Sequence, residues 1–188
     1  RQEGTLIGAV KGYSRNEGLN LDEKREVTRV GNKKAQAVSI NDEQALLLKS
    51  ADKNSPSGLR NALIMTLLLE HGLRASELVS LTADAFDFDA QTLTFWRKKT
   101  KEWTTHELTV AAYKTAVDYE PLMPIEGGIF LGSRKGGELT DGALNRITLS
   151  RLVQRLGVGI GFYRVEMGYK ANGDLKETKI GTLSAHDC

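Results

Sequence analysis

The sequence predicts a mixed, mainly α-helical fold that carries one small antiparallel sheet of about three strands. Residues 59–71 are rich in Leu, Ala and Met and are apolar almost all round, which is typical of a buried helix. Between residues 86 and 110, apolar and polar side chains alternate with a period of two, which indicates strands. A helical period returns after Thr140. Helical segments therefore flank the sheet in the sequence.

The composition is that of an ordinary globular protein, with 40% hydrophobic and 27% charged residues among 188. This length suffices for one well-buried domain, alone or with a remnant of another. The longest apolar run, residues 62–69 with only Thr66 interrupting it, is far shorter than the roughly 20 residues of a membrane span, and we recognise no signal segment. We therefore expect a soluble, cytoplasmic protein without a membrane partner. Cys188 is the single cysteine, so an internal disulfide is excluded.

Residues 1–38 are interpreted as a remnant of a preceding helix followed by a polar linker, because they are glycine-rich, mixed in charge and only weakly helical. A frayed terminus explains the same composition equally well. Ser39 and Asn41 are candidate N-caps, each with a polar partner three residues later, for a helix that continues to residue 51. We therefore expect one compact domain over residues 39–188.

Arg74 lies between two predicted helices. Pro56 is placed to start the buried helix, and Gly72 is its natural C-cap. A second, short helix is predicted over residues 76–81. Glu77, three residues after Arg74, is spaced to hold the planar guanidinium through a carboxylate contact. Spacing alone fits a purely structural ion pair as well as a functional arginine.

A basic turn joins the second predicted strand to the third. The three strands are predicted over residues 86–89, 92–96 and 103–110. The turn holds four cations in five residues, namely Arg97, Lys98, Lys99 and Lys101. A lysine in this position can reach a phosphodiester or donate a proton to a leaving oxygen, although turns also carry lysine for solubility alone. Because the net charge is only +2, the argument for a nucleic-acid partner depends on such clusters.

The segment after the sheet is predicted to contain two helices and a short strand. Residues 111–119 suit a helix and residues 129–131 a strand, after which Arg134 and Lys135 form part of a basic loop. Thr140 is the predicted cap of an amphipathic helix. Its buried face is expected to contain Leu144, Ile147, Leu152, Val153 and Leu156, and its exposed face Arg151 and Arg155.

The last part of the chain has weaker signals. The glycines in residues 156–161 resemble half of a nucleotide-binding fingerprint, but they follow a helix where that fingerprint follows a strand, so we interpret them as helix termination. Residues 162–182 are predicted to be a polar insertion without a regular period. Ser184 is the predicted N-cap of a helix, and His186 lies near its start, where anions are favoured. A metal site of His186 and Cys188 is not expected, because no second pair of ligands accompanies them.

Three motifs in this order resemble the tyrosine recombinase (phage integrase) family. They are Gly-Leu-Arg-Ala-Ser-Glu-Leu at 72–78, the basic turn roughly 25 residues after Arg74, and Leu-Ser-Ala-His-Asp at 183–187. The resemblance covers residues 39–188 and implies the catalytic-domain fold of that family, incomplete at its C-terminal end. It implies that Arg74 binds the scissile phosphate, with Glu77 in support. It further implies a general-acid lysine, for which Lys99 is favoured, then Lys98, then Lys101, and it assigns His186 to the family's His-x-x-Arg motif.

The resemblance also shows what this chain does not contain. The second arginine of His-x-x-Arg would fall one position beyond Cys188, and the family's later His or Trp and nucleophilic tyrosine would lie further on. Every tyrosine here precedes His186, namely Tyr13, Tyr113, Tyr119, Tyr163 and Tyr169. We therefore expect these residues to be an interior fragment that cannot cleave DNA by itself.

The parent protein is expected, from the same resemblance, to be a tyrosine-type DNA strand-transferase encoded by a prokaryote, phage or mobile element. It would break and rejoin double-stranded DNA through a 3′-phosphotyrosine intermediate, as a tetramer on paired sites, while the fragment is expected to be monomeric. Arginines, histidine and lysine stabilise charge and move protons in such a reaction, so no metal or other cofactor is expected.

Three other interpretations remain open from the sequence. The first is a non-catalytic DNA-binding protein of the same fold, whose affinity would fall steeply with salt. Its phosphate contacts would be Arg97, Lys98, Lys99, Lys101, Arg134, Lys135, Arg151 and Arg155. A type IB topoisomerase shares the chemistry but usually belongs to a much longer chain, and a helical domain without a DNA role is the third. The coding sequence past Cys188 would separate the recombinase from the non-catalytic protein.

Overall fold

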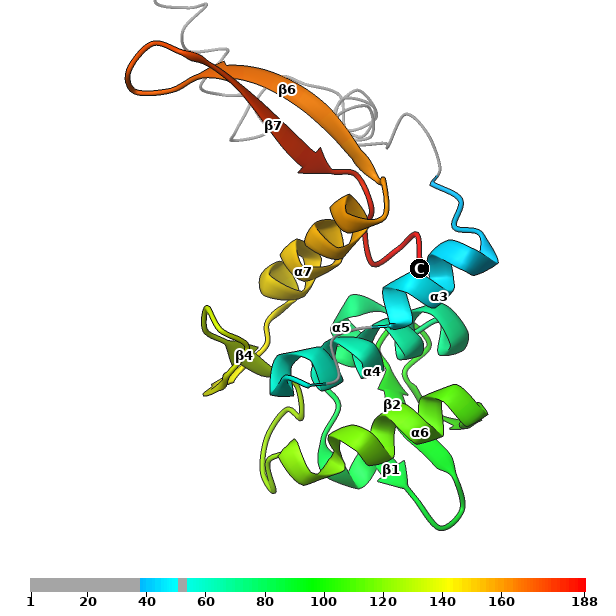
Figure 1. The fold of residues 1–188 in the computed structure, drawn as a ribbon. Helices are drawn as coiled ribbons and strands as arrows, with labels where there is room; N and C mark the ends of the chain where they lie inside the picture. The colour runs from blue at the N-terminus through cyan, green and yellow to red at the C-terminus, as the bar shows by residue number, and fades with distance from the viewer. Residues whose placement is uncertain (1–37, 51–53) are drawn as a thin grey trace, which may run out of the picture. The chain divides into compact units, whose positions relative to one another are not determined.

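The computed structural model describes residues 38–50 and 54–188, which belong to one compact unit, Val38–Cys188. The expected helix remnant and linker in residues 1–37 lie outside the described residues, and the domain boundary there stays a prediction. Elements carry the labels of Figure 1. No helix in the described ranges is long and apolar enough to cross a membrane.

The described chain is a mixed α/β structure with several small antiparallel sheets, which confirms the mixed class and the three-stranded sheet and adds two sheets that were not predicted. In order, the elements are α3 (Asp42–Lys49), α4 (Pro56–His71), α5 (Ala75–Leu78), η2 (Ala83–Ala85), β1 (Phe86–Asp87), β2 (Thr92–Arg97), β3 (Glu102–Glu107), α6 (Val110–Tyr119), η3 (Glu120–Leu122), β4 (Leu131–Ser133), β5 (Leu139–Ala143), α7 (Arg146–Gly159), β6 (Tyr163–Tyr169) and β7 (Leu175–Gly181).

The helix boundaries around α3 and α4 follow local capping chemistry. Asn41 caps α3 with a reciprocal pair of hydrogen bonds to Gln44, at 2.8 and 3.1 Å. Ser55 caps α4, Pro56 is its first residue, and Gly72 ends it in the left-handed region with φ of 61°. Asn41 as a cap, Pro56 as the start of α4 and Gly72 as its C-cap were predicted, because each depends on residues within one turn of the helix end, whereas the cap at Ser55 was not predicted.

The sheet β1–β2–β3 is antiparallel throughout, with Leu93 opposite His106 and Phe95 opposite Thr104. Leu93 and Phe95 are buried, so the predicted inner face is confirmed. The predicted third strand was too long, because β3 ends at Glu107. Thr109 instead caps α6 by accepting a hydrogen bond from the Ala112 amide, at 3.1 Å. Val110 is therefore the first residue of that helix and is 87% exposed.

The β4–β5 hairpin corrects the prediction that Thr140 starts a helix. Thr140 lies within β5, and Asn145 is the true cap of α7, since its side chain accepts from the Thr148 amide at 2.9 Å. Because the helix begins later, Leu144 is buried before the helix starts and Ile147 is 65% exposed, contrary to the expected buried face. Leu152 and Val153 are buried as predicted.

The β6–β7 hairpin occupies residues 163–181, where an irregular insertion was predicted. Val165, Met167, Tyr169 and Leu175 are all more than half exposed, so the alternation of apolar and polar side chains along β6 does not mark a buried face. The hairpin extends from the end of α7 (Figure 1), and its base packs closely on that helix. A Cβ on Gly181 would lie 2.5 Å from the backbone oxygen of Gln154.

The core is centred on α4, whose buried residues include Leu63, Ile64, Leu67 and Leu68. Leu93 of the sheet and Leu149 of α7 belong to the same cluster. Almost every side of α4 contacts another apolar residue, which is why its sequence shows little amphipathic character. The helix thereby holds fixed the segment that follows it, including Gly72 and Arg74.

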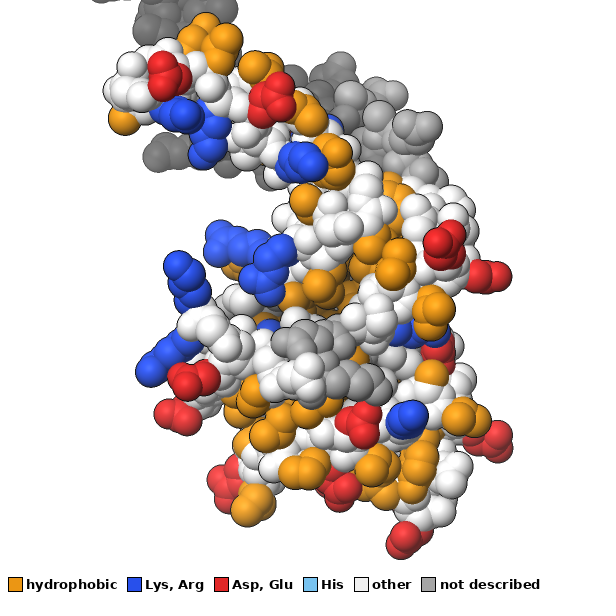
Figure 2. All heavy atoms as spheres, in the orientation of Figure 1, with side chains coloured by type: hydrophobic (Ala, Val, Ile, Leu, Met, Phe, Trp, Pro, Cys, Tyr) orange, Lys and Arg blue, Asp and Glu red, His pale blue; other side chains and the backbone are white. Residues whose placement is uncertain are grey.

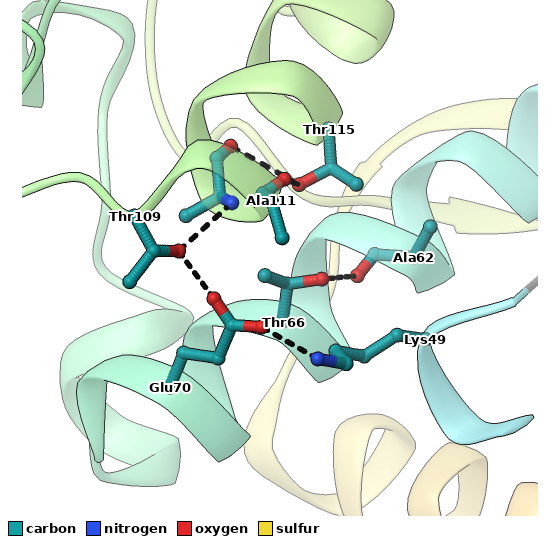
Figure 3. A network of polar contacts seen from close by, with 8 residues as sticks. Lys49, Ala62, Thr66, Glu70, Thr109, Ala111 and Thr115 are labelled. Carbon is teal, nitrogen blue, oxygen red and sulfur yellow. Dashed lines mark hydrogen bonds and ion pairs between the residues drawn. The ribbon is translucent and has the colours of Figure 1, made fainter. Parts of the chain in front are cut away.

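Glu70 joins three helices through one carboxylate (Figure 3). It accepts hydrogen bonds from Lys49 Nζ of α3, at 2.6 Å, and from the hydroxyl of Thr109 at the start of α6. Burial opposes the charged form of Glu70, but these two hydrogen bonds outweigh it and lower the pKa of the carboxyl group. The contacts fix α3 and α6 against the C-terminal half of α4.

We expect Gly181→Ala to lower the free energy of unfolding by about 1–3 kcal/mol, because its Cβ would clash with the backbone of α7. Gly168→Ala in the same hairpin is the matched control, since nothing lies within 4 Å of a Cβ there. It should change stability by no more than about 0.5 kcal/mol. Denaturant unfolding measures both, and equal effects would show that the hairpin does not pack on α7 as described.

Candidate functional site

Arg74 and Glu77 form the centre of the candidate site. Arg74 occupies the N-cap position of α5 with an extended backbone, directly after the turn at Gly72. The Glu77 carboxylate accepts the Arg74 backbone N–H at 2.8 Å and its Nη1 at 2.9 Å. Glu77 is only 2% exposed, whereas the Arg74 side chain is 38% exposed. The carboxylate therefore fixes one edge of the guanidinium, and the other donors have no partner among the described residues.

A pocket of about 460 Å³ lies beside this pair. Its lining residues come from three parts of the chain, the α5 region, the end of β2 and the start of α7. They are Ser76, Glu77, Val79, Ser80, Trp96, Lys98 and Arg146. Two cations thus converge on a pocket whose wall includes the residue that holds Arg74, which is an arrangement suited to an anionic ligand.

The basic turn places its lysines differently from one another. Lys98 lines the pocket, because it continues the outer face of β2 beyond Trp96. Lys99 and Lys101 are exposed and do not line it, and Lys101 has a positive φ of 57°. Of the three lysines that the family resemblance offers as the general acid, only Lys98 lines the same pocket as Glu77.

Arg97 faces the opposite way and is half-buried. Its guanidinium lies 5.3 Å above the ring centre of Phe95, and its Nη2 is 3.5 Å from His106 Nε2. His106 in turn stacks on His71, the last residue of α4, with ring centres 5.8 Å apart. Arg97 thus packs on Phe95 and links the lysine turn to the end of α4, and its expected contact with DNA stays a prediction.

This histidine stack was not predicted from the sequence. His71 Nε2 and Arg97 Nε are buried without a hydrogen-bond partner in the described part of the chain. Burial lowers the pKa of His71, as does His106, while Glu70 raises it. Burial also lowers the pKa of His106, as does Arg97, while Glu77 raises it. The balance keeps both rings neutral near pH 7.

The remaining predicted cations lie on the surface. Arg134 and Lys135 are exposed in the β4–β5 turn, and Arg151 and Arg155 are exposed on α7, a helix that contains no acidic residue. Figure 2 shows Lys and Arg side chains bordering a hollow beside α7 and the β4–β5 hairpin, with others on the β6–β7 hairpin. Arg146 was not predicted as a site residue. With a helix starting at Thr140, it would lie within the second turn and not at the helix start, where it lines the pocket.

Arg60 fixes the β4–β5 hairpin to α4. This arginine is 2% exposed and donates to the Leu131 carbonyl, to Ser133 Oγ at 3.3 Å and to Asn61 Oδ1. Burial lowers its pKa, and no carboxylate among the described residues is paired with it. The hairpin that carries Arg134 and Lys135 is therefore attached to the same helix that ends before Arg74.

His186 is exposed and does not line the pocket. The residues around it form a turn in which the Ser184 amide and hydroxyl both donate to Asp187 Oδ2, at 2.7 and 2.8 Å. The helix predicted from Ser184 is not formed within the described residues, although these bonds resemble those of a helix start. No group of three His, Cys, Asp or Glu residues in the described ranges is placed to hold a metal ion.

We expect the free energy of unfolding to decrease as the pH falls below about 6.5, the ordinary pKa of histidine. Because His71 and His106 have lowered pKa values when folded, the unfolded chain binds protons first and is favoured by acid. Denaturant unfolding at pH values between about 5 and 8 tests this. The double variant His71→Phe/His106→Phe keeps the stacking but should show a flatter profile, and an unchanged slope would contradict the assignment. Protonation of Glu70, whose pKa is also lowered in the folded chain, reduces the free energy of unfolding further only below its ordinary pKa of 4.5.

The sequence profile described as the Phage integrase family matches residues 39–161. Over 106 residues the chain is 33% identical to the tyrosine recombinase XerC of Brucella melitensis, a match that covers 54% of this chain and 32% of that protein. The chain thus spans about a third of this curated relative.

Similar folds occur among solved structures. XerA recombinase has a TM-score of 0.56 at 19% identity, covering 69% of this chain and 45% of that one. The integrase of mycobacterium phage Brujita has a TM-score of 0.51 at 21% identity, covering 85% and 45%. The Tn1549 transposon integrase, solved in complex with transposon right end DNA, has a TM-score of 0.53 at 14% identity, covering 90% and 54%. At these identities the likeness concerns the fold.

Proposed function

This chain belongs to the phage integrase (tyrosine recombinase) family, and from that membership we propose that it is the phosphate-binding part of a site-specific DNA recombinase. The observation that carries the proposal is the buried Glu77, which holds Arg74 at the edge of a pocket also lined by Lys98 and Arg146. The parent protein would break and rejoin double-stranded DNA through a 3′-phosphotyrosine, as a tetramer on paired sites in the cytoplasm of its host.

The proposed roles follow from the chemistry of a phosphodiester. Attack on phosphorus builds negative charge on the non-bridging oxygens, which the free donors of Arg74 would bind. Glu77 orients the guanidinium, because one of its oxygens holds Nη1 and the other the backbone amide. A lysine would donate a proton to the departing 5′-oxygen. His186 would join this site from the C-terminal turn.

We assign the general acid to Lys98 ahead of Lys99, which reverses the order favoured by the sequence motif. Lys98 lines the same pocket as Glu77, whereas Lys99 does not. Proton donation requires hydrogen-bond reach of the leaving oxygen, so position decides between neighbouring lysines. Arg146 would provide a second cation at the pocket.

The nucleophile would come from a further segment of the parent. Tyr119 is fully buried and donates its hydroxyl to the Ile129 carbonyl at 2.8 Å, so it is not available for attack. Tyr163 and Tyr169 belong to the β6–β7 hairpin and, like Tyr119, precede His186, unlike the nucleophile of the family.

The surface cations supply the wider DNA contact in this proposal. Arg134, Lys135, Arg151 and Arg155 are exposed, and Figure 2 shows Lys and Arg side chains around the hollow beside α7. The Tn1549 integrase, similar in fold, was solved with DNA bound. A non-catalytic DNA-binding protein is the second candidate function, and it is favoured by the position of His186 outside the pocket lining.

Duplex DNA binding should weaken with salt, and its slope measures the phosphate contacts. Because each neutralised phosphate contributes about 0.9 to the slope of log K against log salt, Arg74→Ala and Lys98→Ala should each reduce it by about one. Lys114→Ala removes the same charge from exposed α6 and is the matched control, with no change expected. Fluorescence anisotropy at several salt concentrations gives the slopes. A slope near zero for the unaltered chain would refute DNA binding.

The purified 188-residue chain should form no covalent adduct with a nicked duplex designed to trap a phosphotyrosine. Denaturing electrophoresis of labelled DNA detects such an adduct directly. Its appearance would show that one of the tyrosines present acts as nucleophile, contrary to the proposal.

A further inference from the structure

The outer face of the β2–β3 hairpin carries the two tryptophans of the chain, side by side. Trp96 and Trp103 are directly opposite one another in the strand register, and their rings meet edge to face with centres 5.6 Å apart. Trp96 is 43% exposed and Trp103 69% exposed. A large aromatic surface is therefore open to solvent at the end of the hairpin that leads into the lysine turn.

The strand alternation explains why these rings face outward. Leu93, Phe95 and Arg97 point toward the core, so Thr94, Trp96 and then Lys98 point to the other side. Trp96 and Lys98 both line the pocket beside Arg74 and Glu77. The aromatic surface is thus continuous with the proposed phosphate site and next to its cations.

Contacts other than this pair also hold the register of the hairpin. Its inner face is already fixed by Leu93 and Phe95 in the core, and its outer face by a hydrogen bond of 2.9 Å between the hydroxyls of Thr94 and Thr105. Tryptophan exposed to this extent leaves apolar surface in water, which is typical of a binding surface more than of a folding requirement. An exposed indole face beside Lys98 suits a nucleobase and its phosphate.

We propose that Trp96 and Trp103 form a stacking platform for one unpaired nucleobase of the DNA strand whose phosphate is bound at Arg74 and Lys98. The inference rests on the proposed function and adds the form of the substrate, a strand with a base displaced from the duplex beside the scissile phosphate. Stacking on an indole accepts any base, because every base has a π-face. The platform therefore selects locally opened DNA without selecting its sequence.

The test compares two duplexes, identical except that one contains a single unpaired base. The 188-residue chain should bind the duplex with the unpaired base roughly 5- to 100-fold more tightly than the paired one. Because all the tryptophan fluorescence comes from Trp96 and Trp103, stacking should also quench it more strongly with the unpaired base. Titration with each duplex records affinity and quenching together.

Variants separate stacking from a structural role. Trp96→Leu should reduce the preference to less than about twofold, whereas Trp96→Phe should keep part of it, since phenylalanine still stacks. Thr94→Val removes the neighbouring cross-strand hydrogen bond and should keep the full preference, which makes it the matched control. If Trp96→Leu does not fold, Trp103→Leu at the more exposed position carries the same comparison.

The possible results distinguish the stacking platform from the proposed function. Salt-dependent binding of both duplexes with equal affinity and equal quenching would overturn the stacking platform and leave the proposed function intact. Binding of neither duplex would overturn both. An equal loss of affinity for both duplexes in Trp96→Leu, with a lowered Tm, would show that the pair stabilises the hairpin and would also overturn the platform.

Discussion

The buried carboxylate of Glu77 is the constraint from which the candidate site follows. It is almost fully excluded from water, and it is stable there because Arg74 supplies both a backbone and a side-chain donor. The same two contacts begin α5 and direct the guanidinium. The Glu77 carboxylate therefore caps the start of α5, and the two donors of Arg74 compensate the cost of burying its charge. The remaining donors of the Arg74 guanidinium stay open for an anion.

Rigid attachment to α4 gives the site its geometry. The last residue of the helix, His71, stacks on His106 of the sheet, and its C-cap Gly72 lies two residues before Arg74. Arg97 continues that contact to the base of the lysine turn. At the other end of α4, Arg60 binds the β4–β5 hairpin. Elements that are distant in the sequence are thus fixed to one buried helix, as the proposed phosphate site requires if it is to hold its ligand in one orientation.

The parts of the fold that were predicted correctly depend on short-range chemistry. Asn41 and Gly72 each cap a helix through groups a few residues away, and Leu93 and Phe95 share a face because strands alternate. The predictions that were wrong concern segments where the local sequence allows more than one structure. Thr140 and Asn145 are both plausible caps, and only the pairing of β5 with β4 excludes the first. The β6–β7 hairpin was missed although β6 alternates apolar and polar side chains, because the glycines and charged residues around this alternation favoured an irregular segment.

The sequence by itself determined the family, the arginine with its carboxylate partner and the basic turn, because motif spacing and charge are properties of the chain alone. Only the tertiary structure decided which side chains share a pocket. Lys98 and Lys99 are neighbours in the turn after β2, yet only Lys98 lines the pocket, and Trp96 and Trp103 become partners only when β2 pairs with β3. Direction and pairing depend on contacts between distant segments, which no local pattern contains.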